Sequence, residues 1–479
     1  MTALVLVALM AMIPSGASSD AEPSGQCGDA VSWSVSGSGE LRLTGHGPMH
    51  DYGYSEKNPW YDYRDSIVSV SIDDGITYIG TCAFLGCHRV TGIDVPGSVT
   101  EIGLRAFCEC SSLERISLPS SLAEIGVAVF EDCTSLRSVD LPDSLTSIGQ
   151  EAFRGCDSLR DVSIGANLSW IPYRTFFSCP ALERITVSDG NGSYTSVDGV
   201  LFDDGIRELI CYPSGKTDAE YSVPSTVNEI WSFAFEFNTH LRVLTVPDSV
   251  ATIGNDAFQM CTALERASIP STVTVLDDSI FYGCQSLEGI EIHDTVERIG
   301  ISAFCDCKSL TRVFIPDSVT VLDNYSFEGC TALEYIRVPS GIDDPGVYIL
   351  SELSLYEYPG AEEVDQFECL IQGREWRGVG DGVLYSCPMS EFLVDGEQYA
   401  KVFTKEGDLI VPPEDPVVEG RVFEGWDGYT EGMAADGDHV FEALFDSGNG
   451  SGSNLLWVGI LAVIAVCAAV AVLVLRRGR

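Results

Sequence analysis

The sequence predicts a β-rich solenoid built from coils of 23 residues. The first observation is a phenylalanine that recurs every 23 residues in two series. The series occupy positions 84, 107, 130, 153 and 176, and then 235, 258, 281, 304 and 327. The second observation is a cysteine three residues after the phenylalanine, at positions 87, 110, 133, 156, 179, 261, 284, 307 and 330. A fixed period of about 20–50 residues is typical of a solenoid, because each coil buries its core only against its neighbours.

The coil over residues 113–133 shows how one unit is expected to fold. Ile116 and Leu118 alternate with Ser117, which is the period of a strand. Pro119 ends this strand because it has no amide hydrogen to give to a ladder. A second extended stretch follows, and a short helical or 3₁₀ turn is expected to close the coil.

The repeat position of nine cysteines predicts buried thiols. Each of them occupies one inward position of its coil, next to the repeat phenylalanine and a leucine. Free cysteine is among the most buried residue types and packs as a small hydrophobic group. Disulfides between neighbouring coils are the alternative that the sequence leaves open. Outside the repeat, Cys369 and Cys387 are a candidate disulfide pair.

The two ends of the chain predict a membrane anchor. Residues 1–19 join a short apolar run to small residues, which is the pattern of a signal peptide; a buried first helix is the alternative. Residues 455–475 carry no charge and span about 32 Å as a helix, enough to cross a bilayer core. The basic tail 476–479 is expected in the cytoplasm, with the preceding chain outside. The Gly- and Ser-rich residues 447–454 form a flexible linker.

One coil is irregular. The step between the two phenylalanine series is 59 residues, which is not a multiple of 23. We expect an enlarged coil over residues 188–227, with its extra residues projecting from the rod. Such an insertion fits either a binding loop or a tolerated surface loop. Asp189, Asn191 and Ser193 loosely resemble a calcium loop, but the later ligands of such a loop are missing.

The repeat Ile-Pro-x-Ser-Val-x-x-Ile-Gly-x-x-Ala-Phe-x-x-Cys-x-x-Leu resembles the BspA-type leucine-rich repeat, the Treponema pallidum class. The leucine-rich repeat solenoid then covers residues 72–340. Residues 20–71, which include Pro59 and Trp60, resemble the N-terminal cap that covers the open edge of the first coil. The resemblance implies a surface adhesin or receptor that binds matrix proteins, other cells or glycans.

A second resemblance concerns residues 391–446. Their motifs, among them Lys405-Glu-Gly-Asp-Leu-Ile-Val-Pro412, resemble the Listeria–Bacteroides repeat of the internalin B type, a small β-grasp-like module. The resemblance implies a core around Phe423 and Trp426. Residues 341–390 match neither pattern and are expected to cap the solenoid and connect it to this module.

Composition and motifs exclude several functions. The chain has 71 Asp and Glu against 27 Lys and Arg, a formal net charge of −44, so it would repel nucleic acid. No HExxH, GxSxG, P-loop or strand-linked GxGxxG motif is present, so we expect neither an enzyme nor a cofactor. His46 and His50 have the spacing of a metal pair, but the Gly and Pro between them preclude an aligning helix, and no metal is expected. Candidate N-glycosylation sites are Asn167, Asn191, Asn324 and Asn449.

Binding is the function that the repeat surface favours. The positions two and four residues after the repeat leucine point outward from the predicted strands. They carry the candidate ligand-binding residues Arg115, Arg184, Arg266, Arg312, Phe314, Tyr335 and Arg337. Arginines on an acidic protein can dock a carboxylate, a sulfate or an acidic glycan. The alternative is that the arginines pair with the glutamates next to them, Glu114, Glu183, Glu265 and Glu334.

Two functions remain open at this point. The first is a membrane-anchored cell-surface protein that acts as an adhesin or as a receptor for an extracellular protein or glycan. The second is a passive structural or envelope-spacer protein without a specific ligand. The sequence names neither the ligand nor the oligomeric state.

Overall fold

The computed structural model describes residues 22–337, apart from 54–56, and several shorter segments beyond them. These segments are 344–345, 368–371, 374–379, 383–385, 389–403, 410, 412–413, 415–418, 421–431, 433–435 and 439–445. The chain divides into two compact units. The first comprises residues up to 310, with 315–332 and 341–357, and the second comprises 311–314, 333–340 and residues from 358 onward.

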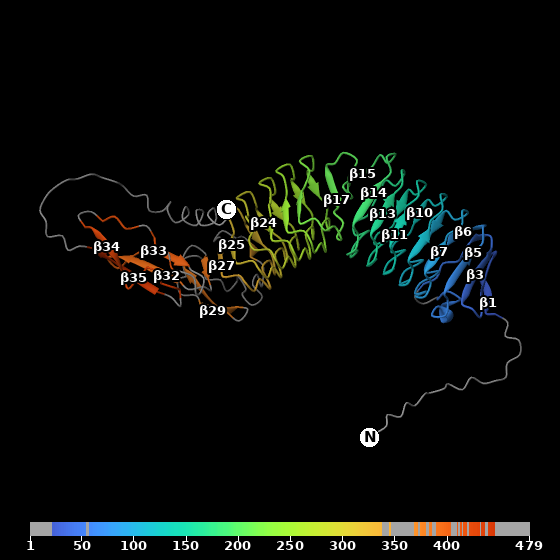
Figure 1. The fold of residues 1–479 in the computed structure, drawn as a ribbon, viewed down its shortest axis with the longest axis horizontal. Coiled ribbons are helices and arrows are strands. Elements are labelled where there is room, and N and C mark those ends of the chain that lie inside the picture. Colours follow the sequence, from blue (N-terminus) through green and yellow to red (C-terminus); the bar gives the residue numbers. More distant parts are fainter. Residues whose placement is uncertain are drawn as a thin grey trace, which may run out of the picture. The chain divides into compact units, whose positions relative to one another are not determined.

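The first unit is a solenoid whose coils contribute to two rows of short strands (Figure 1). The first row follows the repeat leucine, and within this unit it consists of β5 (Ser69–Ile72), β7 (Gly92–Asp94), β9 (Arg115–Ser117), β11 (Ser138–Asp140), β13 (Asp161–Ile164), β14 (Arg184–Val187), β18 (Glu220–Ser222), β20 (Val243–Thr245) and β22 (Arg266–Ala267). Hydrogen-bonded neighbours in this row are parallel and in register, so that Val162 of β13 lies opposite Val139 and Ile185. The predicted solenoid of 23-residue coils is therefore confirmed.

The second row lies closer in sequence to the repeat phenylalanine. It consists of β4 (Gly47–Pro48), β6 (Ile76–Ile79), β8 (Glu101–Ile102), β10 (Glu124–Ile125), β12 (Ser147–Ile148), β17 (Glu208–Cys211), β19 (Glu229–Ile230), β21 (Thr252–Ile253), β23 (Val275–Leu276), β24 (Arg298–Ile299), β26 (Val321–Leu322) and β28 (Asp344–Pro345). Its hydrogen-bonded neighbours are parallel, except where the enlarged coil adds two antiparallel strands. The two rows enclose the core between them.

The core contains a continuous stack of phenylalanine rings in each half of the unit. In the first half, Phe84 and Phe107 lie 5.1 Å apart between ring centroids, with an interplanar angle of 2°. In the second half, Phe304 and Phe327 are also 5.1 Å apart, at 5°. Each ring is covered by its own copy in the next coil, which is the packing expected when no coil can bury its core alone.

The segment that closes each coil is not helical, and here the sequence-based expectation of a helical or 3₁₀ turn is wrong. The residue two before the phenylalanine has a φ between 53° and 65°, and the residue two after it has a φ between 56° and 72°. These left-handed residues turn the amides toward the next coil instead of toward the preceding turn. Arg105 N–H thus donates to the carbonyl of Val127, and Phe107 N–H donates to that of Val129, each over 3.0 Å. Alternate amides therefore join neighbouring coils, whereas the amides between them, such as those of Ala106 and Cys108, make turn bonds to the carbonyl three residues before.

The N-terminal residues cover the first coil. The strands β1 (Ser24–Gly28), β2 (Val31–Val35) and β3 (Glu40–Gly45) form an antiparallel meander, and β3 pairs in parallel with β5. A 3₁₀ turn, Tyr61–Tyr63, follows the fully buried Trp60. The indole of Trp60 extends the ring stack, 6.1 Å from Phe84, and its Nε1 donates to the carbonyl of Ala83 over 2.9 Å. The cap therefore supplies both the ring and the donor that a preceding coil would supply.

The enlarged coil is folded into the rod, which corrects the expectation that its extra residues project from it. They form β15 (Tyr194–Val197) and β16 (Val200–Asp203), which pair antiparallel, and β16 pairs antiparallel with β17. Val200, Leu201 and Phe202 are fully buried. The insertion is retained inside because it contributes apolar side chains of its own, which stabilise the structure only when they are removed from water.

The second unit begins with a mixed sheet. In it β25 (Arg312–Phe314) pairs in parallel with β27 (Tyr335–Arg337), and β27 pairs antiparallel with β31 (Val383–Tyr385). β30 (Arg374–Val379) and β29 (Glu368–Ile371) continue the sheet as antiparallel strands. The region predicted as a cap and connector, 341–390, thus contributes three strands that extend a sheet begun by repeat residues.

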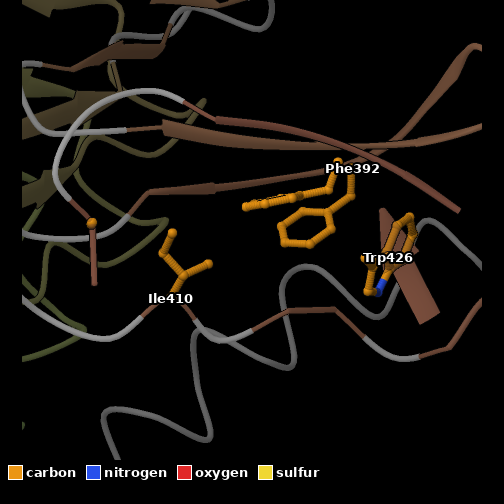
Figure 2. Close-up of a cluster of buried hydrophobic side chains, with 5 residues drawn as sticks. Phe392, Ile410 and Trp426 are labelled. Atoms are coloured by element: carbon orange, nitrogen blue, oxygen red, sulfur yellow. The ribbon is translucent and has the colours of Figure 1, made fainter. Parts of the chain in front are cut away.

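The remaining strands form a separate four-stranded sheet with the order β33-β32-β35-β34. They are β32 (Met389–Val394), β33 (Glu397–Phe403), β34 (Phe423–Asp427) and β35 (His439–Phe445), and β32 and β35 are parallel. Phe392, Ile410 and Trp426 pack in its core, where the ring centroids of Phe392 and Trp426 are 4.9 Å apart (Figure 2). Trp426 is buried as predicted, whereas Phe423 is only partly buried against the cluster. The assignment of this sheet to the Listeria–Bacteroides repeat stays a prediction.

Several predicted segments lie outside the described residues. They are the signal peptide 1–19, the linker 447–454, the transmembrane helix 455–475 and the tail 476–479. Within the part of the chain that is described, no helix is both long enough and apolar enough to cross a bilayer.

Candidate functional site

The candidate arginines lie on the outward face of the strands that follow the repeat leucine. Arg115, Arg184 and Arg266 are exposed in β9, β14 and β22, and Arg312 is exposed in β25 of the second unit. The alternation of the strands places them there, since the residue between two outward positions is directed to the core. They do not form a continuous row, because other side chains hold the equivalent position in the intervening coils. Ser138 and Asp161, for example, stand between Arg115 and Arg184.

Two of the four arginines are ion-paired with a carboxylate of the preceding coil. Arg115 Nη1 lies 3.0 Å from Asp94 Oδ1, and Arg184 Nη2 bonds to Asp161 Oδ1. Both pairs are exposed, so each contributes at most about 1 kcal/mol to stability. Their partners are not the glutamates next to them in sequence.

Three of those glutamates, Glu114, Glu183 and Glu265, have other partners one coil away. Glu114 pairs with Arg137 over 3.2 Å, and Glu265 pairs with Arg242 over 2.6 Å. Residues one position after the repeat leucine therefore form their own ion pairs between coils. The proposed pairing of the candidate arginines with their sequence neighbours is wrong, because neighbouring coils lie closer to these side chains than adjacent residues on a strand do.

Arg266 differs from Arg115 and Arg184. Among the residues that the structure describes, no carboxylate lies within 4.0 Å of Arg266 or of Arg312. The glutamate before Arg266 is occupied by Arg242. The guanidinium of Arg266 is thus exposed with its five N–H donors available for a ligand that carries a carboxylate or sulfate.

A depression of about 300 Å³ lies beside Arg266. It is lined by Val243, Leu244, Thr245, Arg266, Ala267, Ser268, Ile269, Glu291 and His293. The depression occurs where the first row of strands stops, because the coil after β22 forms no strand over residues 288–293. Gly289 weakens an extended segment, and His293 stands where most coils have the strand-ending proline. The break in the ladder leaves a hollow on an otherwise regular face.

The polar groups of the depression set the ligand chemistry. Ser268 Oγ is held by the backbone of Val246, since it accepts from the amide over 2.8 Å and donates to the carbonyl over 3.3 Å. Glu291 is almost fully exposed and lies 4.0 Å from His293 Nδ1. Arg266 is therefore the one fixed positive charge that lines the hollow, and an anionic group is the ligand part that it can hold.

The other candidates lie in the second unit. Phe314 of β25 is 56% exposed, and the guanidinium of Arg337 lies 4.8 Å from the centre of its ring. Arg312 and Tyr335 are register partners on β25 and β27. The structure brings these four residues together on one small sheet, whereas the arginines of the first unit sit on separate coils.

The repeat cysteines are buried thiols without disulfide bonds. Burial raises the pKa of Cys261 and of Cys87 to about 12, and it raises that of Cys156 well above its usual range. A thiol that stays protonated is a poor nucleophile and a poor metal ligand. Cys387 lies outside the described residues, and only the backbone of Cys369 is placed, in β29. The proposed disulfide between them stays a prediction.

The remaining candidates from the sequence are structural where they can be described. Asn191 is buried, its Nδ2 donates to the carbonyls of Gly165 and Leu168, and its Oδ1 accepts from two amides. It is therefore neither an accessible glycosylation site nor a calcium ligand in the folded chain. Asn167 is exposed, the sequon of Asn324 ends in the fully buried Ser326, and Asn449 lies outside the described residues. The described residues contain no cluster of His, Cys, Asp and Glu that could hold a metal ion, His46 and His50 included.

The sequence reasoning missed a group of aromatic residues. Trp170 and Tyr173 are 56% and 47% exposed, and both rings contact Trp231. The sequence does contain one indication of this group, which is a tryptophan at a repeat position that is often glycine. Trp231 stands at the position that is occupied in other coils by Gly80, Gly103, Gly126, Gly149, Gly254 and Gly300.

Comparison with known proteins agrees with the architecture. The family model described as BspA type leucine rich repeat region matches residues 57–192 and 218–334, together more than half of the chain. The interval between the two matches, 193–217, lies within the enlarged coil. Among curated proteins there is no significant match.

Solved structures show the same fold. A leucine-rich repeat protein from Eubacterium ventriosum is 26% identical, with a TM-score of 0.59, over 67% of this chain and 92% of that one. A leucine rich cell surface protein from Faecalibacterium prausnitzii is 28% identical, with a TM-score of 0.50, over 67% of this chain and 95% of that one. With the repeat spacing, the solenoid and the family match in agreement, the chain belongs to the BspA-type leucine-rich repeat family.

Proposed function

We propose that this chain is a membrane-anchored cell-surface protein that binds an extracellular protein or glycan and acts as an adhesin or receptor. The family and the similarity to a bacterial cell-surface protein support the location. The signal peptide 1–19 and the helix 455–475 belong to this proposal, which leaves the solenoid outside the cell. The high negative charge suits an exposed, soluble surface and disfavours nucleic acid as a partner.

The observation that carries the proposal is the unpaired Arg266 beside the depression. Arg115 and Arg184 are ion-paired on flat strands, and such a surface offers little for a specific ligand. At Arg266 the surface is hollow and the guanidinium has no carboxylate partner. A ligand with a carboxylate or a sulfate would form charge-assisted hydrogen bonds there, and the hollow would receive the adjoining part of the ligand. Neither a cofactor nor a catalytic step is part of this proposal.

The experiment is a binding screen with the full-length chain on an array of carboxylated, sulfated and neutral glycans and acidic peptides. The variant is Arg266→Ala, and the matched control is Arg115→Ala, which removes an exposed arginine from the same strand position. We expect binding to acidic probes that falls at least about tenfold in Arg266→Ala and stays near the wild-type level in Arg115→Ala. Absence of binding to every probe, or equal binding by wild type and Arg266→Ala, contradicts the proposal. Absence of binding together with lateral self-association favours the spacer function instead.

A further inference from the structure

A second surface feature lies where the enlarged coil interrupts the ring stack, on residues that the Arg266 depression does not include. Trp170 and Tyr173 come from the coil before the insertion, and Trp231 comes from the coil after it. The ring centroids of Trp170 and Trp231 are 6.4 Å apart, and those of Tyr173 and Trp231 are 5.1 Å apart. We call these three residues the aromatic platform.

The platform lies at the insertion, where the 23-residue step between coils is interrupted. In six other coils the position of Trp231 is glycine, and a Cβ at Gly149 would lie 2.3 Å from the backbone nitrogen of Val127; Asp277 and Asp323 hold the position in two further coils. The coil of Trp231 directly follows the insertion, and the Trp231 amide donates to the carbonyl of Leu209 over 2.9 Å. Trp231 itself is held in place, because its Nε1 donates to Glu208 Oε2 over 3.0 Å and only 9% of the residue is exposed. The two exposed rings therefore rest on a fixed third ring.

A small cavity opens beneath the platform. Tyr173, Arg174, Trp231 and Glu236 are among its lining residues, and its volume of about 30 Å³ corresponds to roughly two water molecules. Glu236 is 5% exposed, and its Oε2 has no hydrogen-bond partner among the described residues. Nε of Arg174 is likewise buried and without a partner. Buried polar atoms in proteins are normally satisfied, so these two indicate a place for a polar guest.

The surroundings of the platform carry both donors and acceptors. Glu208 and Glu229 are register partners on β17 and β19 and supply carboxylate oxygens next to Trp231. The guanidinium of Arg174 lies 4.1 Å from the ring centre of Phe177 and supplies N–H donors. An anion would be repelled by the two glutamates. The charge of Arg174 is balanced by Glu151, 3.3 Å away, so a cation is the competing ligand that the test must exclude. A neutral ligand with hydroxyl groups, which both donate and accept, is the class that matches both.

We propose that the aromatic platform binds a neutral sugar residue. The apolar C–H face of the ring would stack on Trp170 and Tyr173, while hydroxyl groups bond to the carboxylates of Glu208 and Glu229. A hydroxymethyl group is of the size that enters the cavity and reaches Glu236 and Arg174 in place of water. This inference deepens the proposed surface-binding function and rests on it for its biological setting, but the two sites share no residue.

The test is saturation-transfer-difference NMR on the full-length chain, kept in a detergent that has neither a sugar nor an ammonium headgroup. The probes are the methyl glycosides of glucose, galactose, mannose and N-acetylglucosamine, with tetramethylammonium and acetate as charged comparators. We expect transfer to the ring protons of at least one glycoside. Trp170→Ala and Tyr173→Ala should each lower its association constant about tenfold or more, and Trp170→Phe should retain part of the affinity.

The matched control is Ile301→Ala. Ile301 holds the same repeat position as Tyr173 and is 42% exposed, but it has no aromatic platform beside it. Binding by this variant should equal that of wild type. No transfer from any glycoside, transfer from tetramethylammonium or acetate alone, or equal losses in Trp170→Ala and Ile301→Ala would each overturn the inference. Arg266→Ala should leave glycoside binding intact, which separates a failure here from a failure of the proposed function.

Discussion

Sγ of Cys133 lies 3.1 Å from the carbonyl oxygen of Phe107, in the preceding coil, and donates a hydrogen bond to it. The same bond recurs in eight coils over 3.0–3.3 Å, always from a repeat cysteine to the phenylalanine 26 residues earlier. The two residue types that mark the repeat are therefore bonded to each other across coils. The cysteine is small enough for the core and gives a second donor to a carbonyl that already accepts a backbone amide, as Phe107 accepts that of Cys110.

This thiol ladder predicts that the repeat cysteines resist alkylation in the folded chain. Iodoacetamide at pH 8 should leave Cys133, Cys156 and Cys261 unmodified, because they are buried and protonated, and should modify all three in guanidinium chloride. Mass spectrometry of tryptic peptides measures both states. Modification of the native chain at the denatured rate, or peptides joined by disulfides between neighbouring coils, would refute the ladder.

The same thiols predict a loss of stability at alkaline pH. The unfolded chain releases a cysteine proton near the usual pKa of about 9, whereas burial raises the pKa of Cys261 to about 12 in the folded chain. The folded state thus holds more protons in this interval, so the contribution of these thiols to the free energy of unfolding should be constant below about pH 9 and fall above it. Each such thiol contributes up to about 1.4 kcal/mol per pH unit. Urea titrations between pH 8 and pH 10 measure the slope, and Cys261→Ala should reduce it.

Asn238 takes the place of the cysteine in one coil and should contribute more to stability than a thiol does. Its Nδ2 donates to the carbonyls of Ser214 and Lys216, each over 3.1 Å, and its Oδ1 accepts from the amides of His240 and Leu241. Asn238→Ala leaves these buried groups without partners and should lower the free energy of unfolding by about 2–4 kcal/mol. Cys261→Ala, at the same position of the next coil, should cost only about 1–2 kcal/mol. Equal costs in urea unfolding would contradict the special role of Asn238.

Glu131 is a buried carboxylate between two arginines. Its Oε2 lies 3.3 Å from Nη2 of Arg105, and its Oε1 bonds to Arg154. Glu131→Gln leaves two guanidinium groups without a counter-charge and should destabilise the chain by about 3 kcal/mol. The control is Glu114→Gln, which breaks an exposed pair with Arg137 and should cost less than about 1 kcal/mol. If Glu131→Gln has only a small effect on thermal unfolding, the contacts of Glu131 with Arg105 and Arg154 do not stabilise the fold.

Glu236 should make stability depend on pH near neutrality. Burial raises its pKa to about 9, although Arg174 and the Ser178 backbone oppose the shift. The folded chain keeps this proton while the unfolded chain loses it near pH 4.5, so the contribution of Glu236 to stability should fall as pH rises from about 5 to 9. Glu236→Gln removes this dependence. The free energy of unfolding of the variant, relative to that of wild type, should therefore increase as pH rises. A difference that is the same at pH 5 and pH 8 would exclude the buried neutral carboxyl.

The regular part of this fold is predictable from the sequence because the period alone assigns each residue to a position. The phenylalanine and cysteine positions face inward, and Arg115, Arg184 and Arg266 face outward, as the spacing requires. The closing turns were not predicted in this way, because the first left-handed position, as at Arg105, is not glycine in any described coil. Glycine marks the second position in some coils only, at Gly86, Gly155, Gly283 and Gly329.

The sites depend on departures from the period, and those are harder to interpret. Residues 200–202 are buried because of how they pack in three dimensions. The spacing of residues in the sequence carries no information about that packing. The hollow beside Arg266 arises because residues 288–293 form no strand, and Gly289 and His293 were its visible signs. The ion-pair partners could not be predicted from the sequence either. Asp94, for example, lies next to Arg115 in space but 21 residues away in the chain.

The central claim is that Arg266 and its hollow form the ligand-binding surface. The most direct measurement is the affinity of the full-length chain for the best acidic probe of the array, at low and at physiological salt, with Arg266→Glu and Arg115→Glu beside wild type. The account predicts that Arg266→Glu abolishes binding, that Arg115→Glu keeps it within about twofold of wild type, and that wild-type affinity falls with salt. Undiminished binding by Arg266→Glu, or an equal loss in both variants, would contradict it.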